Sequence, residues 1–177
     1  LGILSSSINK ELNISIPKNA PNFFFLGIQK DELNIFSEKI YEIDNEAEMV
    51  IVPMISARIE AINNRKPKDV VELENKSSWF IKGERRISWS KEPPVNNPVL
   101  KGEWWNEDDE NKLKLSLDSK VANDLKLKIG DLITFNIYGN RITGTIENFR
   151  KVNYRDLNIN FAILFNPKFA SDIPHEF

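Results

Sequence analysis

Residues 115–165 constrain the fold more than any other stretch, because they predict a helix, a hairpin and a buried strand with almost no connecting loop. Asp118 is placed to cap a short helix, since its carboxylate can accept hydrogen bonds from the free N–H groups of the first turn. Val121, Ala122 and Leu125 then recur at helical spacing. The pattern therefore predicts a short helix directly after Asp118.

Two more strands and a tight turn are predicted after this helix. Residues 133–138 alternate apolar and polar side chains, which is typical of a half-buried strand. Gly139-Asn140 is a two-residue hairpin signal, because glycine at the first loop position suits a type II′ turn. Residues 141–152 form the return strand, and the nearly continuous apolar run at 160–165 predicts a strand buried on both faces.

The first third of the chain predicts a strand, a helix and a second strand. Residues 23–28 (FFFLGI) are a strand candidate, residues 29–43 an amphipathic helix, and residues 48–62 a second strand. Pro53 cannot donate to a sheet, so a bulge or an edge is expected there. The apolar face of the helix consists of residues at helical spacing: Leu33, Phe36, Ile40 and Ile43. This order predicts a βαβ unit, with a right-handed crossover if its strands are parallel.

Composition narrows the classes of protein to be considered. The chain has 177 residues, a net charge of −2 and no cysteine, which removes disulfides, thiol nucleophiles and thiolate metal sites. Arg85-Arg86 lie between Trp79 and Trp89, an arrangement that can bind single-stranded nucleic acid, but the acidic balance favours a strand with aromatic side chains inside and arginines outside. No nucleic-acid partner is therefore predicted.

The chain is predicted to be an excised soluble fragment of a longer protein, a prediction that is compatible with a membrane-anchored parent. Its first residue is Leu1 rather than Met, and it shows no signal peptide. The longest apolar runs, residues 23–28 and 49–55, are far shorter than the roughly 20 residues of a membrane-spanning helix.

No catalytic set can be assembled from the sequence. His175 is the single histidine and is expected in a solvent-exposed tail, where a lone imidazole has no fixed partner. Asp108, Asp109 and Glu110 are interpreted as a solvated charge run rather than a metal site, because no glycine stands where a calcium loop requires one. Phosphate-binding glycine loops and a nucleophile elbow are also missing. We therefore predict no enzyme activity, no metal and no cofactor.

Trp104-Trp105 are the candidate contact residues for a ligand or partner. Consecutive residues of an extended segment point to opposite faces, so at most one of the two easily faces the core. The other then offers an exposed apolar contact to a partner or a hydrophobic ligand. The alternative is that a neighbouring loop covers both side chains.

The sequence resembles the MacB/FtsX-like family of ABC-transporter permeases, in particular its YbbP-like branch. The resemblance extends over about residues 21–174, and six stretches carry it in order: PNFFFLGIQ (21–29), VPMISARIEAIN (52–63), ERRISW (84–89), PVLKGEWW (98–105), LSLDSKVANDLKLKIGDLITF (115–135) and RKVNY…NFAILFNP (150–167). The family usually has glycine where Lys126 stands, at a left-handed helix cap, so lysine is expected to carry a modest steric cost there.

The resemblance implies an α+β fold in which a porter-like βαβ subdomain carries an inserted small β-rich subdomain, as in the periplasmic core of MacB-like permeases. Residues 1–62 and 154–177 are expected to form the porter-like subdomain, and residues 63–153 the insert. The porter-like part is expected to be incomplete at its C-terminus, which predicts an unpaired sheet edge near residues 159–165 or 23–28.

The resemblance also implies a function. The chain is expected to be a non-catalytic extracytoplasmic (periplasmic) domain of a permease in the bacterial inner membrane. Such a domain couples ATP-driven conformational change to export or handling of an apolar or lipid-linked cargo. The implied partners are a cytoplasmic ATPase subunit and a periplasmic protein. The alternative is a stand-alone periplasmic or surface binding module with no transport role.

Overall fold

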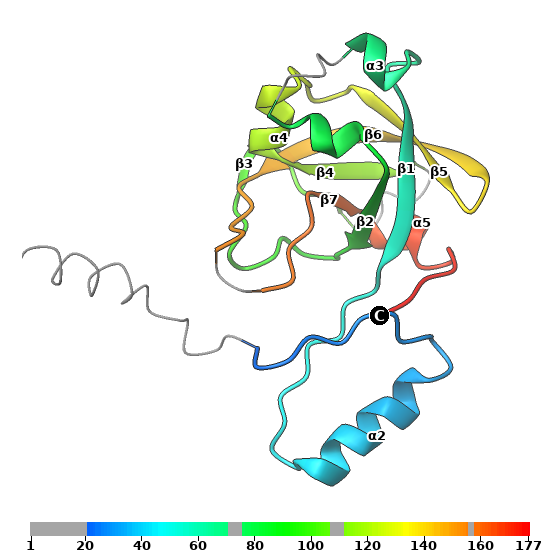
Figure 1. Ribbon diagram of the computed structural model, residues 1–177. Coiled ribbons are helices and arrows are strands. Elements are labelled where there is room, and N and C mark those ends of the chain that lie inside the picture. Colours follow the sequence, from blue (N-terminus) through cyan, green and yellow to red (C-terminus); the bar gives the residue numbers. More distant parts are fainter. Residues whose placement is uncertain (1–20, 71–75, 107–111, 156–157) are drawn as a thin grey trace, which may run out of the picture.

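The fold is built on one sheet of seven strands, six of which close into a barrel (Figure 1). The computed structural model describes residues 21–70, 76–106, 112–155 and 158–177. The strand order is β3-β6-β4-β7-β2-β1-β5, and a further pairing between β5 and β6 closes the ring. The strands are β1 (Ile55–Ile62), β2 (Glu84–Trp89), β3 (Val99–Gly102), β4 (Lys114–Asp118), β5 (Leu132–Ile137), β6 (Asn140–Arg150) and β7 (Ile163–Phe165).

Most helices are short and lie against the barrel. They are α3 (Pro67–Val70), the 3₁₀ helix η1 (Ser78–Ile81), α4 (Ser119–Asp124) and α5 (Pro167–Ala170). The longer α2 (Leu33–Ile43) lies apart from the barrel, at the bottom of the view in Figure 1. Residues 21–53, which contain α2, are called the arm here.

The barrel interior is filled by inward-facing apolar side chains. β1 alternates buried with less buried positions over most of its length, so one face of it fills the interior, whereas β5 has three consecutive buried residues, 133–135. The side chains with no exposed surface include Phe80, Phe135, Phe165, Ile87, Leu115, Leu117, Ile133 and Ile146. Two pairings are parallel, β4 with β6 and β2 with β7, so they join segments that are far apart in the sequence.

The predictions for residues 115–165 are largely confirmed. Helix α4 begins after Asp118, whose carboxylate accepts a hydrogen bond from the backbone N–H of Lys120 at 3.0 Å. All three residues of β7 are buried, as the apolar run predicted. Lys126 adopts a left-handed conformation at φ 56°, as the family comparison implied.

The hairpin is also confirmed, but its predicted turn was wrong by one residue. Ile137 pairs with Asn140, so the loop is Tyr138-Gly139 and not Gly139-Asn140. Both loop residues have positive φ (50° and 86°), the arrangement of a type I′ turn, in which glycine takes the second position. The Asn136 side chain accepts a hydrogen bond from the Gly139 N–H at 3.0 Å and so stabilises the turn.

The predicted strand at residues 23–28 was wrong. These residues form no strand and are mostly exposed; the Phe23 side chain is 78% exposed. An apolar run forms a strand only where another strand pairs with it, and here only Ile28 finds a backbone partner, Phe177. The helix predicted at residues 29–43 is found at Leu33–Ile43, with none of its residues buried. The strand predicted at residues 48–62 is found only beyond Pro53, as β1. The described residues of the arm thus form no βαβ unit, and the porter-like fold stays a prediction.

Two short chain segments connect the arm to the barrel. Met54 and Glu176 exchange both backbone hydrogen bonds (2.7 and 3.1 Å), as do Ile28 and Phe177 (2.9 and 2.8 Å). The chain therefore enters and leaves the barrel side by side, at a site called the neck here. Two strands of the barrel, β1 and β7, belong to the ranges expected to be porter-like, 1–62 and 154–177. Its other strands belong to the expected insert, residues 63–153. The unpaired edge predicted at residues 159–165 was wrong, because β7 pairs with β4 on one side and β2 on the other.

Candidate ligand groove

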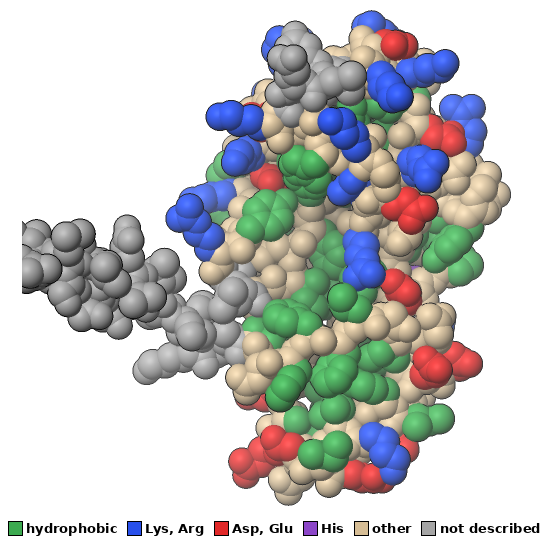
Figure 2. Space-filling model, in the orientation of Figure 1, with side chains coloured by type: hydrophobic (Ala, Val, Ile, Leu, Met, Phe, Trp, Pro, Cys, Tyr) green, Lys and Arg blue, Asp and Glu red, His purple; other side chains and the backbone are tan. Residues whose placement is uncertain are grey.

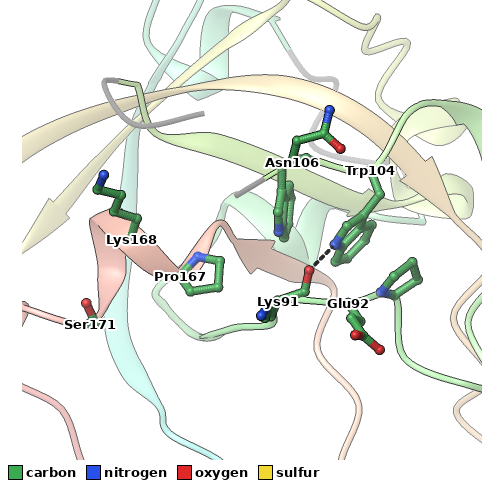
Figure 3. A pocket seen from close by; sticks show the side chains of 9 residues that line it. Lys91, Glu92, Trp104, Asn106, Pro167, Lys168 and Ser171 are labelled. Atoms are coloured by element: carbon green, nitrogen blue, oxygen red, sulfur yellow. Dashed lines mark hydrogen bonds between the residues drawn. The ribbon is translucent and has the colours of Figure 1, made fainter. Parts of the chain in front are cut away.

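The two predicted contact residues line the same groove on the barrel surface (Figure 3). The groove has a volume of about 600 Å³, within the size range of small-molecule sites. Three segments form it: the loop after β2, the segment after β3, and α5. The lining residues are Lys91, Glu92, Pro93, Trp104, Trp105, Asn106, Pro167, Lys168 and Ser171.

The two tryptophans form one rigid aromatic wall. Their ring centroids are 4.1 Å apart with an interplanar angle of 37°. The Trp104 Nε1–H donates to the Lys91 carbonyl at 2.9 Å, and the Trp105 Nε1–H donates to the Ser90 carbonyl at 2.9 Å. Trp105 is 6% exposed and packs with Met54, Phe161 and Leu164, whereas Trp104 is only partly buried.

This geometry differs from the sequence prediction in one respect. One ring is buried and the other partly exposed, as expected, but the two rings lie against each other instead of on opposite faces. The segment leaves β3 at Gly102, whose φ is +80°, and forms no strand from Glu103 to Asn106. Without a regular strand, consecutive side chains need not alternate.

Two buried asparagines hold irregular segments of the barrel surface, and one of them directly precedes α5. Asn97 is 5% exposed; its side-chain amide donates to Asn160 at 2.9 Å and its side-chain oxygen accepts from the Asn153 N–H at 3.0 Å. Asn166, 3% exposed, accepts from the Lys114 N–H at 2.9 Å just before α5 begins. Each amide replaces backbone pairing where the chain is irregular, and Asn166 thereby fixes the segment that leads into α5.

The rim of the groove is polar and carries charges of both signs. Lys91, Glu92, Asn106, Lys168 and Ser171 are exposed, and Figure 3 shows them around the aromatic wall. The groove therefore joins an apolar floor to a ring of hydrogen-bonding groups. Such a surface combines apolar contact with hydrogen bonding, the combination found in small-molecule sites.

A polar cluster around the buried Arg150 was not found from the sequence. Arg150 has no exposed surface, and burial lowers its pKa to about 10, partly offset by the charges of Tyr154 and Asp118. One Arg150 nitrogen, Nη2, donates to the Phe161 carbonyl, whereas Nε and Nη1 have no partner among the described residues. Tyr154 is 53% exposed, but its hydroxyl donates to Asp118 at 3.1 Å; partial burial, followed by the charge of Asp118, raises the pKa of Tyr154. The cluster links β6, the cap of α4 and the segment before β7, which is a structural role.

His175 is not the solvent-exposed residue that was predicted. It is partly buried, with its ring edge-to-face against Trp89 (4.8 Å between centroids) and Phe177 (5.1 Å). Its Nδ1 lies 2.8 Å from the Ile173 carbonyl oxygen. The imidazole therefore packs at the neck rather than in a site.

The other sequence candidates give no second site. Arg85 lies over the Trp79 ring at 5.4 Å, an intramolecular cation–π contact. Asp108, Asp109 and Glu110 lie outside the described residues. Across residues 21–70, 76–106, 112–155 and 158–177, no group of three or more metal-binding side chains converges. Within these same ranges no helix has the length and apolar character needed to cross a membrane.

Comparison with known proteins finds sequence similarity to a component of a membrane transporter. It is 27% identical over 157 residues to an ABC-transporter permease of Escherichia coli strain K12. That protein is YbbP, described as uncharacterised; the match covers 89% of this chain and 18% of the permease. The resemblance to ABC-transporter permeases is thereby confirmed. No family model matches the chain, and no solved structure does.

Proposed function

We propose that the chain is a non-catalytic extracytoplasmic domain of an ABC-transporter permease in the bacterial inner membrane. In this role it couples conformational change driven by a cytoplasmic ATPase to export or handling of an apolar or lipid-linked cargo, together with a periplasmic partner. The similarity to the YbbP permease over most of the chain carries this proposal. The match spans only 18% of that permease, so the link between this chain and the activity of a whole transporter is an inference.

The neck supports a mechanical role. Four backbone hydrogen bonds connect the arm, the start of the barrel and the C-terminal residues, so a displacement of one chain end reaches the barrel directly. The barrel itself is closed, which makes it resistant to deformation. We therefore infer that the barrel moves as a rigid body relative to the arm, and that the arm belongs to the porter-like subdomain.

The surface of the arm supports contact with other parts of a transporter. Figure 2 shows apolar side chains gathered over the lower part of the molecule, whereas Lys and Arg side chains are spread over the barrel. Residues 21–53 carry seven acidic and two basic side chains. The exposed large apolar side chains of the arm are Phe23, Phe24, Phe25, Leu26, Ile35, Tyr41, Ile43, Val50 and Ile51. An apolar surface of this kind marks an interaction face.

A distance measurement in the whole transporter tests the proposal. Spin labels at Tyr41→Cys in the arm and Tyr138→Cys in the barrel measure the distance between these two parts. The chain has no cysteine of its own that would also be labelled. A control pair joins Leu100→Cys in β3 with Tyr138→Cys in the turn between β5 and β6, so both labels belong to the seven-stranded sheet and its hairpin. Addition of ATP with vanadate is expected to change the arm–barrel distance and to leave the control distance unchanged. An arm–barrel distance that stays constant throughout the ATPase cycle contradicts the proposal.

The groove favours a second candidate function, a stand-alone periplasmic or surface binding module. This candidate needs no motion of the barrel against the arm. It also predicts a parent gene with a secretion signal and without flanking apolar helices, whereas the permease proposal predicts such helices and a neighbouring ATPase gene.

A further inference from the structure

The two indole N–H groups limit what the groove can recognise. Both are already bonded to backbone carbonyls, of Lys91 and Ser90, so they are not available to donate to a ligand. Trp104 therefore offers only ring surface, Trp105 is 6% exposed and offers almost none, and the polar interactions must come from the rim. This separation of apolar floor and polar rim decides between the ligand classes.

Two common occupants of aromatic grooves fit poorly. A proline-rich peptide docks in an aromatic-lined groove, but its prolines have no N–H group, so they offer no donor to the Glu92 carboxylate on the rim. A hydrocarbon chain needs an enclosed apolar cavity, whereas exposed charged residues such as Glu92 and Lys168 border this groove. Covering those charges with hydrocarbon would remove them from water without any compensating bond.

A sugar ring has the complementary shape and chemistry. Its axial C–H groups form an apolar face that stacks on an aromatic ring, and its equatorial hydroxyls form a polar edge that both donates and accepts hydrogen bonds. Carboxylate, ammonium, amide and hydroxyl groups all stand on the rim, at Glu92, Lys91, Asn106 and Ser171. We propose that this groove binds a saccharide, with a pyranose ring stacked on Trp104 and its hydroxyls toward the rim. The further step, that the transported cargo is a glycan or a glycan-bearing lipid, rests on the proposed function. Sugar binding by the groove does not depend on it.

Saturation-transfer NMR on the whole chain tests the inference with four probes at millimolar concentration: triacetylchitotriose, maltotriose, a decaproline peptide and laurate. We expect transfer to the ring C–H protons of at least one trisaccharide, and none to the peptide or the fatty acid. Transfer to neither sugar overturns the inference, and so does stronger transfer to decaproline or laurate.

Three variants show whether a positive signal comes from the groove. Trp104→Ala is expected to weaken sugar binding about tenfold or more, as truncation of an aromatic anchor commonly does. Trp79→Ala is the matched control, because Trp79 is 42% exposed on η1, outside the groove. If Trp104→Ala fails to fold, Ser171→Phe fills the groove without altering the aromatic wall and is expected to abolish binding. Sugar binding that survives these groove variants, or that is lost in Trp79→Ala, overturns the assignment.

The outcome is separable from that of the proposed function. Sugar binding is measured on the isolated chain, whereas the arm–barrel distance is measured in the transporter. A chain that binds no sugar but moves with the ATPase cycle refutes only the saccharide inference. A chain that binds sugar without such motion refutes only the transport role.

Discussion

Replacing Lys126 with glycine is expected to stabilise the protein. Lys126 lies just after the cap of α4, in the left-handed region at φ 56°, and this turn lets the Leu127 N–H donate back to the Ala122 carbonyl at 2.8 Å. The bond spans five residues, as in a Schellman motif, and places Leu127 in the core at 7% exposure. The conformation is therefore required, although lysine is poorly suited to it.

The size of the gain follows from two opposing effects. A left-handed conformation costs an L-residue roughly 1–2 kcal/mol, and glycine removes that cost. Glycine also makes the unfolded chain more flexible, which costs about 0.5–1 kcal/mol. The exposed Lys126 side chain contributes little packing. The net expectation for Lys126→Gly is a gain of about 0.5–1 kcal/mol, or about 1–4 °C in Tm for a chain of this length.

Urea unfolding followed by circular dichroism measures this change, with Lys120→Gly as the control. Lys120 is an exposed lysine inside α4, where glycine is expected to destabilise by about 0.5–1 kcal/mol. The two lysine-to-glycine changes should thus have opposite signs. A Lys126→Gly variant that is less stable than wild type refutes the assignment of strain to this position.

Three further perturbations test the fold. Asp118→Ala removes the cap of α4, the acceptor of the Tyr154 hydroxyl and a charge that favours the buried Arg150 guanidinium, so it should cost about 2 kcal/mol in urea unfolding. Asp118→Asn keeps the cap and should cost less; equal costs would show that the charge is unimportant. The pair Met54→Cys and Glu176→Cys should form a disulfide on mild oxidation, detected by mass spectrometry against the single-cysteine variants, and a failure to close would contradict the neck. Gly102→Ala should destabilise by more than about 2 kcal/mol, because its Cβ would lie 2.3 Å from a backbone oxygen. Gly130→Ala is the control, with a similar φ but open space around the Cβ, and should cost less; the reverse order in thermal unfolding would refute the clash.

The sequence was most informative where structure is decided locally. The cap at Asp118, the alternation in β5 and the apolar run of β7 each depend on a few neighbouring residues, and all three were predicted. The turn moved by one residue because Tyr138 tolerates positive φ, which allowed Gly139 to take the second loop position. Local sequence patterns therefore placed this turn only to within one residue.

Closure of the barrel was beyond sequence reasoning. The parallel pairing of β4 with β6, and of β2 with β7, depends on contacts between distant segments, and no local pattern encodes it. The apolar run at residues 23–28 failed as a strand for the same reason, because hydrophobicity does not supply a pairing partner.

The candidate site was predicted in part. Trp104 and Trp105 were selected because adjacent large aromatic residues are hard to bury together, and both line the groove. The contributions of Lys91 and Ser171 were missed, since they reach the groove only through the tertiary fold. Arg150 was also missed, because an arginine at the end of a strand ordinarily faces water.

The neck has a consequence for how this domain can be handled. Since Met54 and Glu176 are hydrogen-bonded neighbours, the segment between them begins and ends at nearly the same point in space. Segments with adjacent ends can be excised, grafted into a surface loop of an unrelated host, or circularly permuted with a short linker. The barrel is thus a portable unit, and a graft of residues 54–176 would present the aromatic groove on a carrier of the experimenter's choice.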